Sequence, residues 1–558
     1  MTPPGPRGTE ARHATLAGWV LAIVSIAAGA FFFTSLGRLW PLADLELLAP
    51  SAGLRAQARE FLERRGFDLE GYRSASALTV DTRGLNYVER AFGRSQAQRW
   101  IAEGYPLVQY RVDFKKRGER TEYSVRLHPE AGLLSWRKWV EDDEPGPRLP
   151  AEQALRAAEL ALTEGLGLEL SAYEARSDSS TEQIDRRDHS FGFERRVSEE
   201  PELREWIQVS VAGDQVVAAS RSLRVPGEAR RAARAAEAPG RALETLGFLL
   251  LAIGALAAFV IFLRRLRDGT AELGRAWIWP AAVFVCLIGT YALETSSLFR
   301  YWEPLWPKWV SDFQYLSFRG LEGVLIVLLL LTVVSAGDAL DREGGYRRGA
   351  ALWTLARGRL FDPMVGRASG RGFLVGLLCG GVMTGAVVLL QWAAQAETAI
   401  QPRGFFFYTL NSASPLAASL LFFFGVALAE ELGYRFFAGT WFLALTGRRW
   451  VAVLLPALIY GLTHTRLDFL PPAEPWWGRA LVLTLVGCVW GWAFLRYDAL
   501  TVVLSHFTAD LFIFNWPRLG SGQLGPVLGS LLVICVPLIP ALGWSVSRLL
   551  GGSGRARS

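Results

Sequence analysis

The sequence predicts an all-α polytopic membrane domain of about ten transmembrane helices, joined to an α+β domain that lies outside the cytoplasm. Three observations predict this fold class. Apolar runs of about 20 residues, the length that crosses a bilayer as a helix, recur from residue 242 to residue 548. A polar stretch, residues 41–240, separates them from one N-terminal apolar run. Within that stretch, segments with helical periodicity alternate with segments of strand periodicity.

The composition excludes a nucleic-acid partner and a disulfide-stabilised fold. Of the 558 residues, 51% are hydrophobic, and 59 basic residues are nearly balanced by 53 acidic ones. Because the chain also lacks a DNA- or RNA-binding motif, we expect no nucleic acid among its partners. Each of the four cysteines lies in an apolar run, so we expect them to pack among helices as small hydrophobic residues.

The first apolar run, residues 16–36, follows a short polar start that contains Arg7 and Arg12. The run is longer than the apolar core of a signal peptide and lacks a clear small-residue cleavage site. We therefore interpret residues 1–40 as a retained transmembrane helix with its flanks.

The polar region, residues 41–240, is predicted to be a soluble α+β domain. Residues 51–65 and 150–164 have helical periodicity, and the second segment begins with a proline. Residues 108–114 (VQYRVDF) and 123–127 (YSVRL) alternate apolar with polar side chains on either side of the turn KKRGER. This pattern predicts an antiparallel hairpin.

A weak internal repeat divides this domain. The segment GFDLEGY at 66–72 aligns without gaps with GLELSAY at 167–173, and each follows a predicted helix. Two such helix-plus-hairpin units resemble the small α+β modules called PepSY domains, and the resemblance implies that the domain binds an extracytoplasmic ligand or regulates the chain. His128 and His189 have no second ligand at metal-binding spacing, so we expect both at the surface.

The rest of the chain is predicted to be almost entirely transmembrane, with connecting helices at 241–370 and a separate core at 371–550. Short arginine-rich loops, such as RRLR at 264–267 and TGRRW at 446–450, fall on one side of the membrane. This predicts that both termini are cytoplasmic and that residues 41–240 are not. The arginine- and alanine-rich composition favours a bacterial inner membrane. With the N-terminal helix, ten spans are predicted, the others being 242–263, 275–293, 321–340, 372–394, 413–438, 450–469, 478–496, 499–516 and 523–548.

Two glycine patterns predict close helix packing. Gly372, Gly376 and Gly380 follow one another at intervals of four, as do Gly487 and Gly491. Small residues at this spacing form one face of a helix and allow two backbones to approach closely.

Among the ionisable side chains inside the predicted spans, six are candidates for a functional site: Glu430, Glu431, Arg435, His464, His506 and Asp510. An ionised group in the hydrocarbon region costs at least ~2.5–3.5 kcal/mol, so such residues usually serve a function. A spacing of four places Glu431 beside Arg435 and His506 beside Asp510. At ~1.5 Å per residue, three helices deliver these groups to roughly 10–20 Å from their cytoplasmic ends, with Glu430 at roughly 12 Å.

The same residues form three motifs: EELGYR at 430–435, YGLTH at 460–464 and HFTAD at 506–510. They resemble the EExxxR, FxxxH and HxxxN/D motifs of the Abi or CPBP family of intramembrane endopeptidases, which includes the CAAX prenyl proteases. The resemblance covers about residues 370–550. The chain departs from the family at Tyr460, where phenylalanine is usual, and at Asp510, where prenyl proteases usually carry asparagine.

The resemblance implies a role for each residue. Glu430 and His464 would hold and activate a water molecule, and His506 with Asp510 would stabilise the oxyanion. Arg435 would pair with Glu431 and support the site. The sequence leaves open a second chemistry, in which Glu430, His464 and His506 bind a catalytic zinc ion as in a metalloprotease. The absence of an HExxH motif favours the glutamate mechanism, and no other cofactor is expected.

The function expected from these motifs is that of an intramembrane endopeptidase acting on membrane-associated or CAAX-like protein substrates. Its partners would be membrane lipids, a peptide or protein substrate, and an extracytoplasmic ligand of the polar domain. One alternative is a non-catalytic membrane receptor or immunity scaffold. Another is a proton-coupled transporter, although such proteins typically show inverted repeats and broken helices, and the sequence shows neither.

Overall fold

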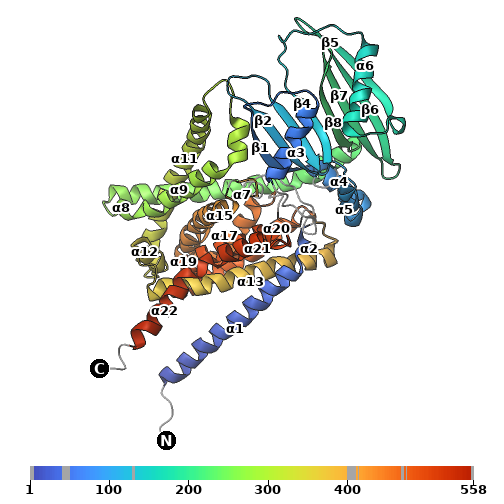
Figure 1. Ribbon diagram of the computed structural model, residues 1–558. Helices are drawn as coiled ribbons and strands as arrows, with labels where there is room; N and C mark the ends of the chain where they lie inside the picture. Colours follow the sequence, from blue (N-terminus) through green and yellow to red (C-terminus); the bar gives the residue numbers. More distant parts are fainter. Residues whose placement is uncertain are drawn as a thin grey trace.

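The chain folds into a bundle of long apolar helices and an antiparallel sheet of eight strands (Figure 1). Both parts of the predicted fold class are therefore present. The computed structural model describes residues 6–40, 51–128, 132–398, 410–412, 414–466, 470–472 and 474–553.

The sheet consists of two four-stranded meanders joined edge to edge. Its strand order is β1-β2-β3-β4-β8-β7-β6-β5, and every neighbouring pair is antiparallel. The predicted hairpin is confirmed, because Phe114 in β2 pairs with Tyr123 in β3. The strands are β1 (Arg73–Val80), β2 (Val108–Lys115), β3 (Tyr123–His128), β4 (Gly132–Lys138), β5 (Glu174–Glu182), β6 (Arg187–Ser198), β7 (Leu203–Ala212) and β8 (Gln215–Arg224).

Each meander follows a helix, as the internal repeat predicted. The first half has α3 (Ser51–Arg64) before β1, and the second has α6 (Ala151–Leu160), extended by a π-helical turn at Ala161–Gly165, before β5. The two aligned heptapeptides are the links between helix and first strand. The repeated unit is thus a helix plus four strands, while the likeness to PepSY domains stays a prediction.

Both helices cover the same face of the sheet, which leaves the other face open. Leu54, Ala58 and Leu62, at intervals of four on α3, are buried against the apolar side of the first meander. The prediction that His128 and His189 lie at the surface is wrong, because both are buried. The ring of His189 is accommodated because Ser180 Oγ and the Leu149 carbonyl lie 2.8 and 2.9 Å from its two nitrogens.

The remaining short helices lie in the sheet domain, at its junction with the bundle, or in the bundle itself. They are α2 (Leu36–Leu39), α4 (Thr82–Phe92), α5 (Arg94–Ala102), the 3-10 turn η3 (Leu170–Ala172), α10 (Thr295–Tyr301), α12 (Ala350–Ala356) and α20 (Trp516–Leu519).

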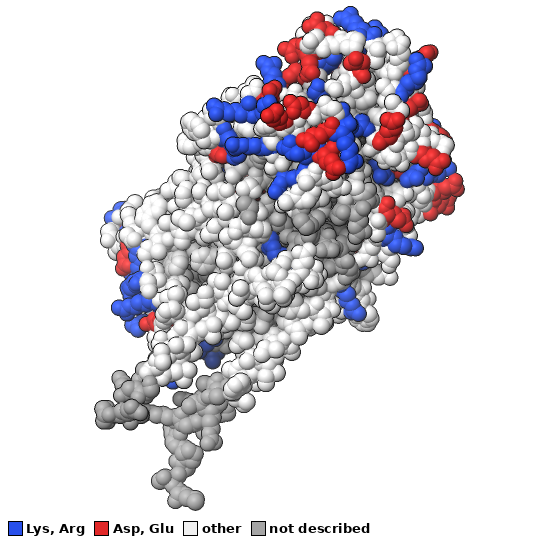
Figure 2. Space-filling view, viewed as in Figure 1, with Lys and Arg blue, Asp and Glu red and all other residues white. Residues whose placement is uncertain are grey.

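Eight of the ten predicted spans are helices long and apolar enough to cross a membrane, so the chain is an integral, multi-pass membrane protein. The other two, α17 (Arg449–Thr463) and α19 (Ala499–Phe514), have 15 and 16 residues. They span about 24 Å at most, less than the ~30 Å hydrocarbon core. Figure 2 shows charged side chains gathered on the sheet domain, above a bundle surface that is mainly uncharged in this view. The eight long segments are Leu16–Thr34 (in α1, Pro6–Thr34), Gly227–Arg267 (α7), Leu273–Leu293 (α8, Leu273–Ala276, and α9, Ile278–Leu293), Lys308–Glu343 (α11), Pro363–Ala394 (α13), Pro415–Thr446 (α15, Pro415–Glu431; η4, Leu432–Gly439; α16, Thr440–Thr446), Gly478–Arg496 (α18) and Leu524–Leu550 (α21, Leu524–Cys535; η5, Val536–Leu538; α22, Ile539–Ser553).

The start of α1 and the end of α22 lie at the end of the bundle that faces away from the sheet (Figure 1). The connection from sheet to bundle is direct, because β8 is followed after two residues by the 41-residue helix α7. The arginine-rich segment 227–241, expected in the soluble domain, forms the first turns of this helix. The domain limit expected at residue 240 therefore falls inside a continuous helix.

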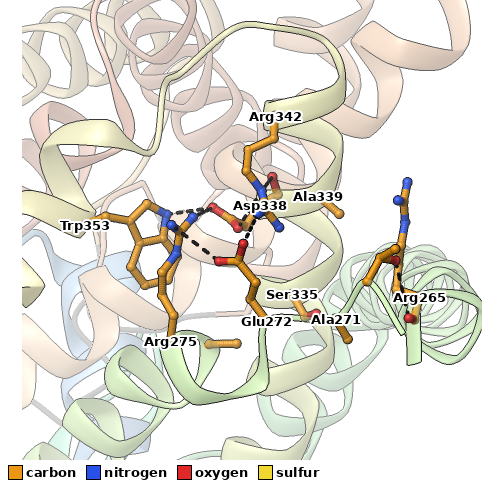
Figure 3. A pocket seen from close by; sticks show the side chains of 11 residues that line it. Arg265, Ala271, Glu272, Arg275, Ser335, Asp338, Ala339, Arg342 and Trp353 are labelled. Atoms are coloured by element: carbon orange, nitrogen blue, oxygen red, sulfur yellow. Dashed lines mark hydrogen bonds and ion pairs between the residues drawn. The ribbon is translucent and has the colours of Figure 1, made fainter. Parts of the chain in front are cut away.

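A network of ion pairs and hydrogen bonds around the buried carboxylate of Asp338 connects α8, α11 and α12 (Figure 3). The carboxylate of Asp338 accepts hydrogen bonds from Arg275 Nη2 at 2.5 Å and Trp353 Nε1 at 2.7 Å, and Arg342 Nε lies 3.2 Å away. The neighbouring Gly337 packs on the bundle core, where an added Cβ would lie 3.1 Å from Phe436. The helix α11 therefore carries this network and also packs closely on η4, which contains part of the EELGYR motif.

The sheet domain is joined to the bundle by hydrogen bonds and ion pairs. Lys115 Nζ donates to the carbonyls of Arg300 and Trp302, at 3.1 and 2.7 Å. The side chain of Asn411 accepts from the Leu78 amide and donates to its carbonyl, at 2.8 and 3.2 Å. Arg90 on α4 forms ion pairs with two glutamates of the bundle loops, Glu397 and Glu474.

This interface predicts a pH-dependent stability through Glu89. Burial raises the pKa of Glu89 from 4.5 to about 7; Glu397 adds to the rise, and Arg94 opposes it. The folded state therefore disfavours the ionised carboxylate, and this penalty grows as the pH rises from 4.5 to about 7. We expect Glu89→Gln to stabilise the protein more at pH 8 than at pH 5, by about 2 kcal/mol.

Thermal unfolding of the full chain at both pH values checks this expectation. Glu103→Gln, an exposed position at the end of α5, is the control and should change stability equally at both pH values. A Glu89→Gln variant with the same stability difference at pH 5 and pH 8 would contradict the argument.

Candidate active site

The two adjacent glutamates stand where the long helix changes its geometry. The α-helical segment α15 ends at Glu431, and the π-helical segment η4 follows directly. Departures of this kind from α geometry occur frequently at functional sites. Across the junction, Arg435 Nη1 donates to Glu431 Oε1 at 2.9 Å, which confirms the predicted pair. Arg435 Nη2 is also 3.4 Å from the Gly487 carbonyl.

The second contributor is His506, on the fully buried helix α19. Its Nδ1 lies 2.8 Å from Glu431 Oε1. Its Nε2 faces two further carboxylates, Asp510 Oδ2 at 3.5 Å and Glu430 Oε2 at 3.8 Å. The four-residue spacing thus brings Asp510 beside His506, as predicted.

The glycines of α13 allow α19 to lie this deep in the bundle. A Cβ on Gly376 would lie 2.7 Å from the carbonyl oxygen of Ser505, and one on Gly372 would lie 2.8 Å from that of Thr501. Contacts this short do not occur, so only glycine permits the backbones of α13 and α19 to approach here. The prediction of close packing is confirmed, and one of these contacts is next to His506.

The third contributor is His464, at the carboxyl end of α17. The helix ends at Thr463, six residues earlier than predicted; residues 467–469 lie outside the described part of the chain. His464 Nδ1 is 2.7 Å from the Tyr460 carbonyl, which can only accept a hydrogen bond. The proton is therefore on Nδ1, and the lone pair of Nε2 faces Glu430 Oε1 at 3.6 Å.

Glu430 is the most accessible of these side chains. Its side chain is 25% exposed, whereas the exposed fractions of Glu431, Arg435 and His506 are 3% or less. Its buried Oε2 has no hydrogen-bond partner among the described residues. Glu430 also lies deeper in the membrane helix than predicted. The helix continues to Thr446, so its end is about 24 Å from Glu430 along the helix axis.

Several site residues were not predicted. Trp490 on α18 stacks on the ring of His506 with centroids 4.1 Å apart, and its Nε1 donates to Ser505 Oγ at 3.0 Å. The guanidinium of Arg435 lies over the rings of Tyr460 and Trp490, at 4.8 and 5.1 Å. Nothing in the sequence indicates that a tryptophan in an apolar run will pack against a buried histidine or arginine. The sequence feature that came closest to indicating these contacts was the predicted close packing at Gly487, because a Cβ there would lie 3.0 Å from Arg435 Nη2.

Each charged or titratable group of the site lies within 3.8 Å of at least one other. Three carboxyl groups face one guanidinium and two imidazoles, and the ring of His506 lies 2.8, 3.5 and 3.8 Å from Glu431, Asp510 and Glu430. In a low-dielectric interior, charges at such distances interact strongly, which favours a protonated, cationic His506 between its carboxylates.

The donor set does not fit the zinc site that the sequence left open. Within the described ranges, no group of three or more His, Cys, Asp or Glu residues is arranged to hold a metal ion. One nitrogen of His506 is engaged by Glu431, and the other faces two carboxylates.

Comparison with known families supports the motif resemblance. Residues 412–512 match the family described as Rce1-like, type II CAAX prenyl endopeptidase Rce1-like. The matched range contains all six residues of the site and lies within the core expected at 371–550. No curated protein and no solved structure matches the chain. Residues 412–512 thus form a domain similar to Rce1-like endopeptidases, and the match does not extend to the sheet domain.

Proposed function

We propose that the chain is an intramembrane endopeptidase that hydrolyses peptide bonds through a water molecule activated by glutamate and histidine. One observation carries the proposal. The accessible carboxylate of Glu430 faces the Nε2 atoms of His464 and His506 at 3.6 and 3.8 Å, within the range that matches the endopeptidase family. These distances are too long for direct hydrogen bonds and short enough for one small polar group to contact each pair.

Water activation is assigned to Glu430 and His464. Hydrolysis begins when a base removes a proton from water as the oxygen attacks the peptide carbonyl carbon. The Nδ1 proton of His464 is held by the Tyr460 carbonyl, so its Nε2 accepts a hydrogen bond from the water and orients it. Glu430 takes the proton and later delivers it to the leaving amine, so proton and bond changes balance.

Stabilisation of the oxyanion is assigned to His506. A tetrahedral intermediate carries negative charge on the former carbonyl oxygen, and a preorganised donor in a dry site stabilises it strongly. Glu431 fixes the His506 ring through Nδ1, and Asp510 and Glu430 favour a cationic ring whose Nε2 proton can be donated. Arg435 holds Glu431 and is a positioning residue.

The substrate class follows from the place of the site. Glu430 lies near the middle of a 32-residue apolar helix, so a substrate must enter the bundle from the membrane or its interface. We propose membrane-associated polypeptides as substrates, CAAX-like carboxyl termini among them, with lipids as the surrounding partner. In this arrangement both termini of the chain are cytoplasmic and the sheet domain is outside.

A direct test is hydrolysis in ¹⁸O-labelled water by the purified full chain in detergent. Farnesylated CAAX peptides and a library of apolar peptides are the substrates, and mass spectrometry detects one heavy oxygen in each new carboxyl terminus. We expect cleavage that persists with a chelator present and that falls at least 10²-fold in His464→Ala. Cleavage that continues undiminished in His464→Ala, or that needs an added metal, would overturn this mechanism.

A further inference from the structure

The open face of the sheet carries a groove of about 310 Å³ at the seam between the two meanders. It lies on the face opposite to α3 and α6 and crosses β2, β3, β4, β8 and β7. A volume of this size is at the lower end of the range for small-molecule binding sites.

The groove arises from the strand register. Ser135 on β4 pairs with Ser220 on β8, and Ala218 on β8 pairs with Ser210 on β7. Because directly opposed residues point to the same face, these four small side chains form the floor along the seam. Longer side chains rise around them, and the hollow follows from this difference in size.

Two arginines on one wall are directly opposed. Arg111 on β2 pairs with Arg126 on β3, and like charges in directly opposed positions destabilise a sheet. Arg137 stands beside them on β4 and also lines the groove. Burial lowers the pKa of the Arg126 guanidinium, and Arg111 lowers it further. The sheet thus keeps several positively charged side chains close together, although their mutual repulsion destabilises it.

The acidic residues of the groove are already engaged. Asp113 accepts a hydrogen bond from Arg111 Nε at 2.7 Å, and Glu122 pairs with Lys115 at 3.0 Å. Across the described part of the chain, Arg126 and Arg137 form no ion pair. Two guanidinium groups therefore face the cavity without a carboxylate partner.

We propose that this groove binds a small organic anion through its carboxylate or phosphate oxygens, with Arg126 and Arg137 as the principal ligands. A guanidinium group matches both kinds of oxyanion because its donors form a planar fork. The serine hydroxyls of the floor add hydrogen-bond donors. Trp139, whose side chain is 54% exposed and lies 5.5 Å under the guanidinium of Arg137, supplies an apolar surface for the rest of the ligand.

The test measures binding to the purified full chain in detergent and does not depend on proteolytic activity. Citrate represents carboxylates and glycerol phosphate represents phosphate esters, each titrated by calorimetry and by thermal unfolding. We expect one or both to bind and to raise the unfolding midpoint, with affinity falling as salt increases. The anion that binds more tightly shows whether the groove takes a carboxylate or a phosphate ester.

Two variants make the assignment specific. Arg126→Gln should unfold at a higher temperature than the parent without ligand, because the opposed positive charge is removed, yet bind the anion at least 10-fold more weakly. Arg137→Gln should also bind at least 10-fold more weakly. Arg148→Gln, an exposed arginine of the same domain, is the control and should bind as the parent does. The proposal fails if neither anion binds, or if the Arg126 and Arg137 variants bind as tightly as this control.

Discussion

Glu430→Gln is expected to lower the rate of peptide hydrolysis at least 10³-fold while the protein stays folded. The glutamine keeps the size of the side chain and its place between His464 and His506, but it cannot take a proton from water. A 10³-fold loss corresponds to about 4 kcal/mol of transition-state stabilisation. The measurement is the rate constant for cleavage in ¹⁸O-labelled water, under saturating substrate.

The matched control is Glu322→Gln, which neutralises an exposed carboxylate on another membrane helix, α11. It should cleave at the parent rate. Equal unfolding midpoints for Glu430→Gln and the parent would show that the loss is chemical. Turnover by a folded Glu430→Gln variant within 10-fold of the parent would remove Glu430 from its assigned role.

Arg435→Met is expected to destabilise the bundle by about 3–5 kcal/mol, because it removes the guanidinium partner of the buried Glu431 carboxylate, which then keeps its contact with His506. The side chains of Arg435 and Glu431 are 2% and 1% exposed, and the guanidinium also contacts two aromatic rings. Methionine retains much of the apolar contact and removes the charge. Thermal unfolding in detergent measures the effect.

The double variant Glu431→Gln with Arg435→Met separates charge from packing. Removing both partners of a buried pair is often nearly neutral, so it should recover most of the lost stability. Arg241→Met, at an exposed pair with the same four-residue spacing on α7, is the control and should change stability by less than about 1 kcal/mol. An Arg435→Met variant no less stable than this control would contradict the argument.

Much of the site could be predicted because many of its residue pairs are close together in the sequence. The pairs Glu431–Arg435 and His506–Asp510 follow from helical spacing, and the glycine spacing of α13 follows from close helix approach. Eight of the ten spans followed from length and apolarity.

Relations between distant segments could not be predicted in this way. No pattern indicates that Ser135 pairs with Ser220, which makes two meanders one sheet, or that Trp490 stacks on His506. The end of α17 was misplaced because the predicted span runs on to residue 469, through the polar residues His464 and Arg466, although the helix ends at Thr463. The burial of His189 depends on a hydroxyl and a carbonyl that the fold brings to the ring.

The helix α7 connects the sheet domain directly to the membrane site. Its 41 residues span about 60 Å, starting at the end of β8 and passing the residue before His464, where a Cβ on Gly247 would lie 2.7 Å from the Thr463 amide nitrogen. Glu244 on α7 also pairs with Arg466, two residues after His464. A single helix that begins at the sheet therefore packs directly against the backbone of the residue before His464. A movement of the sheet domain that displaces α7 would therefore also displace the backbone next to His464.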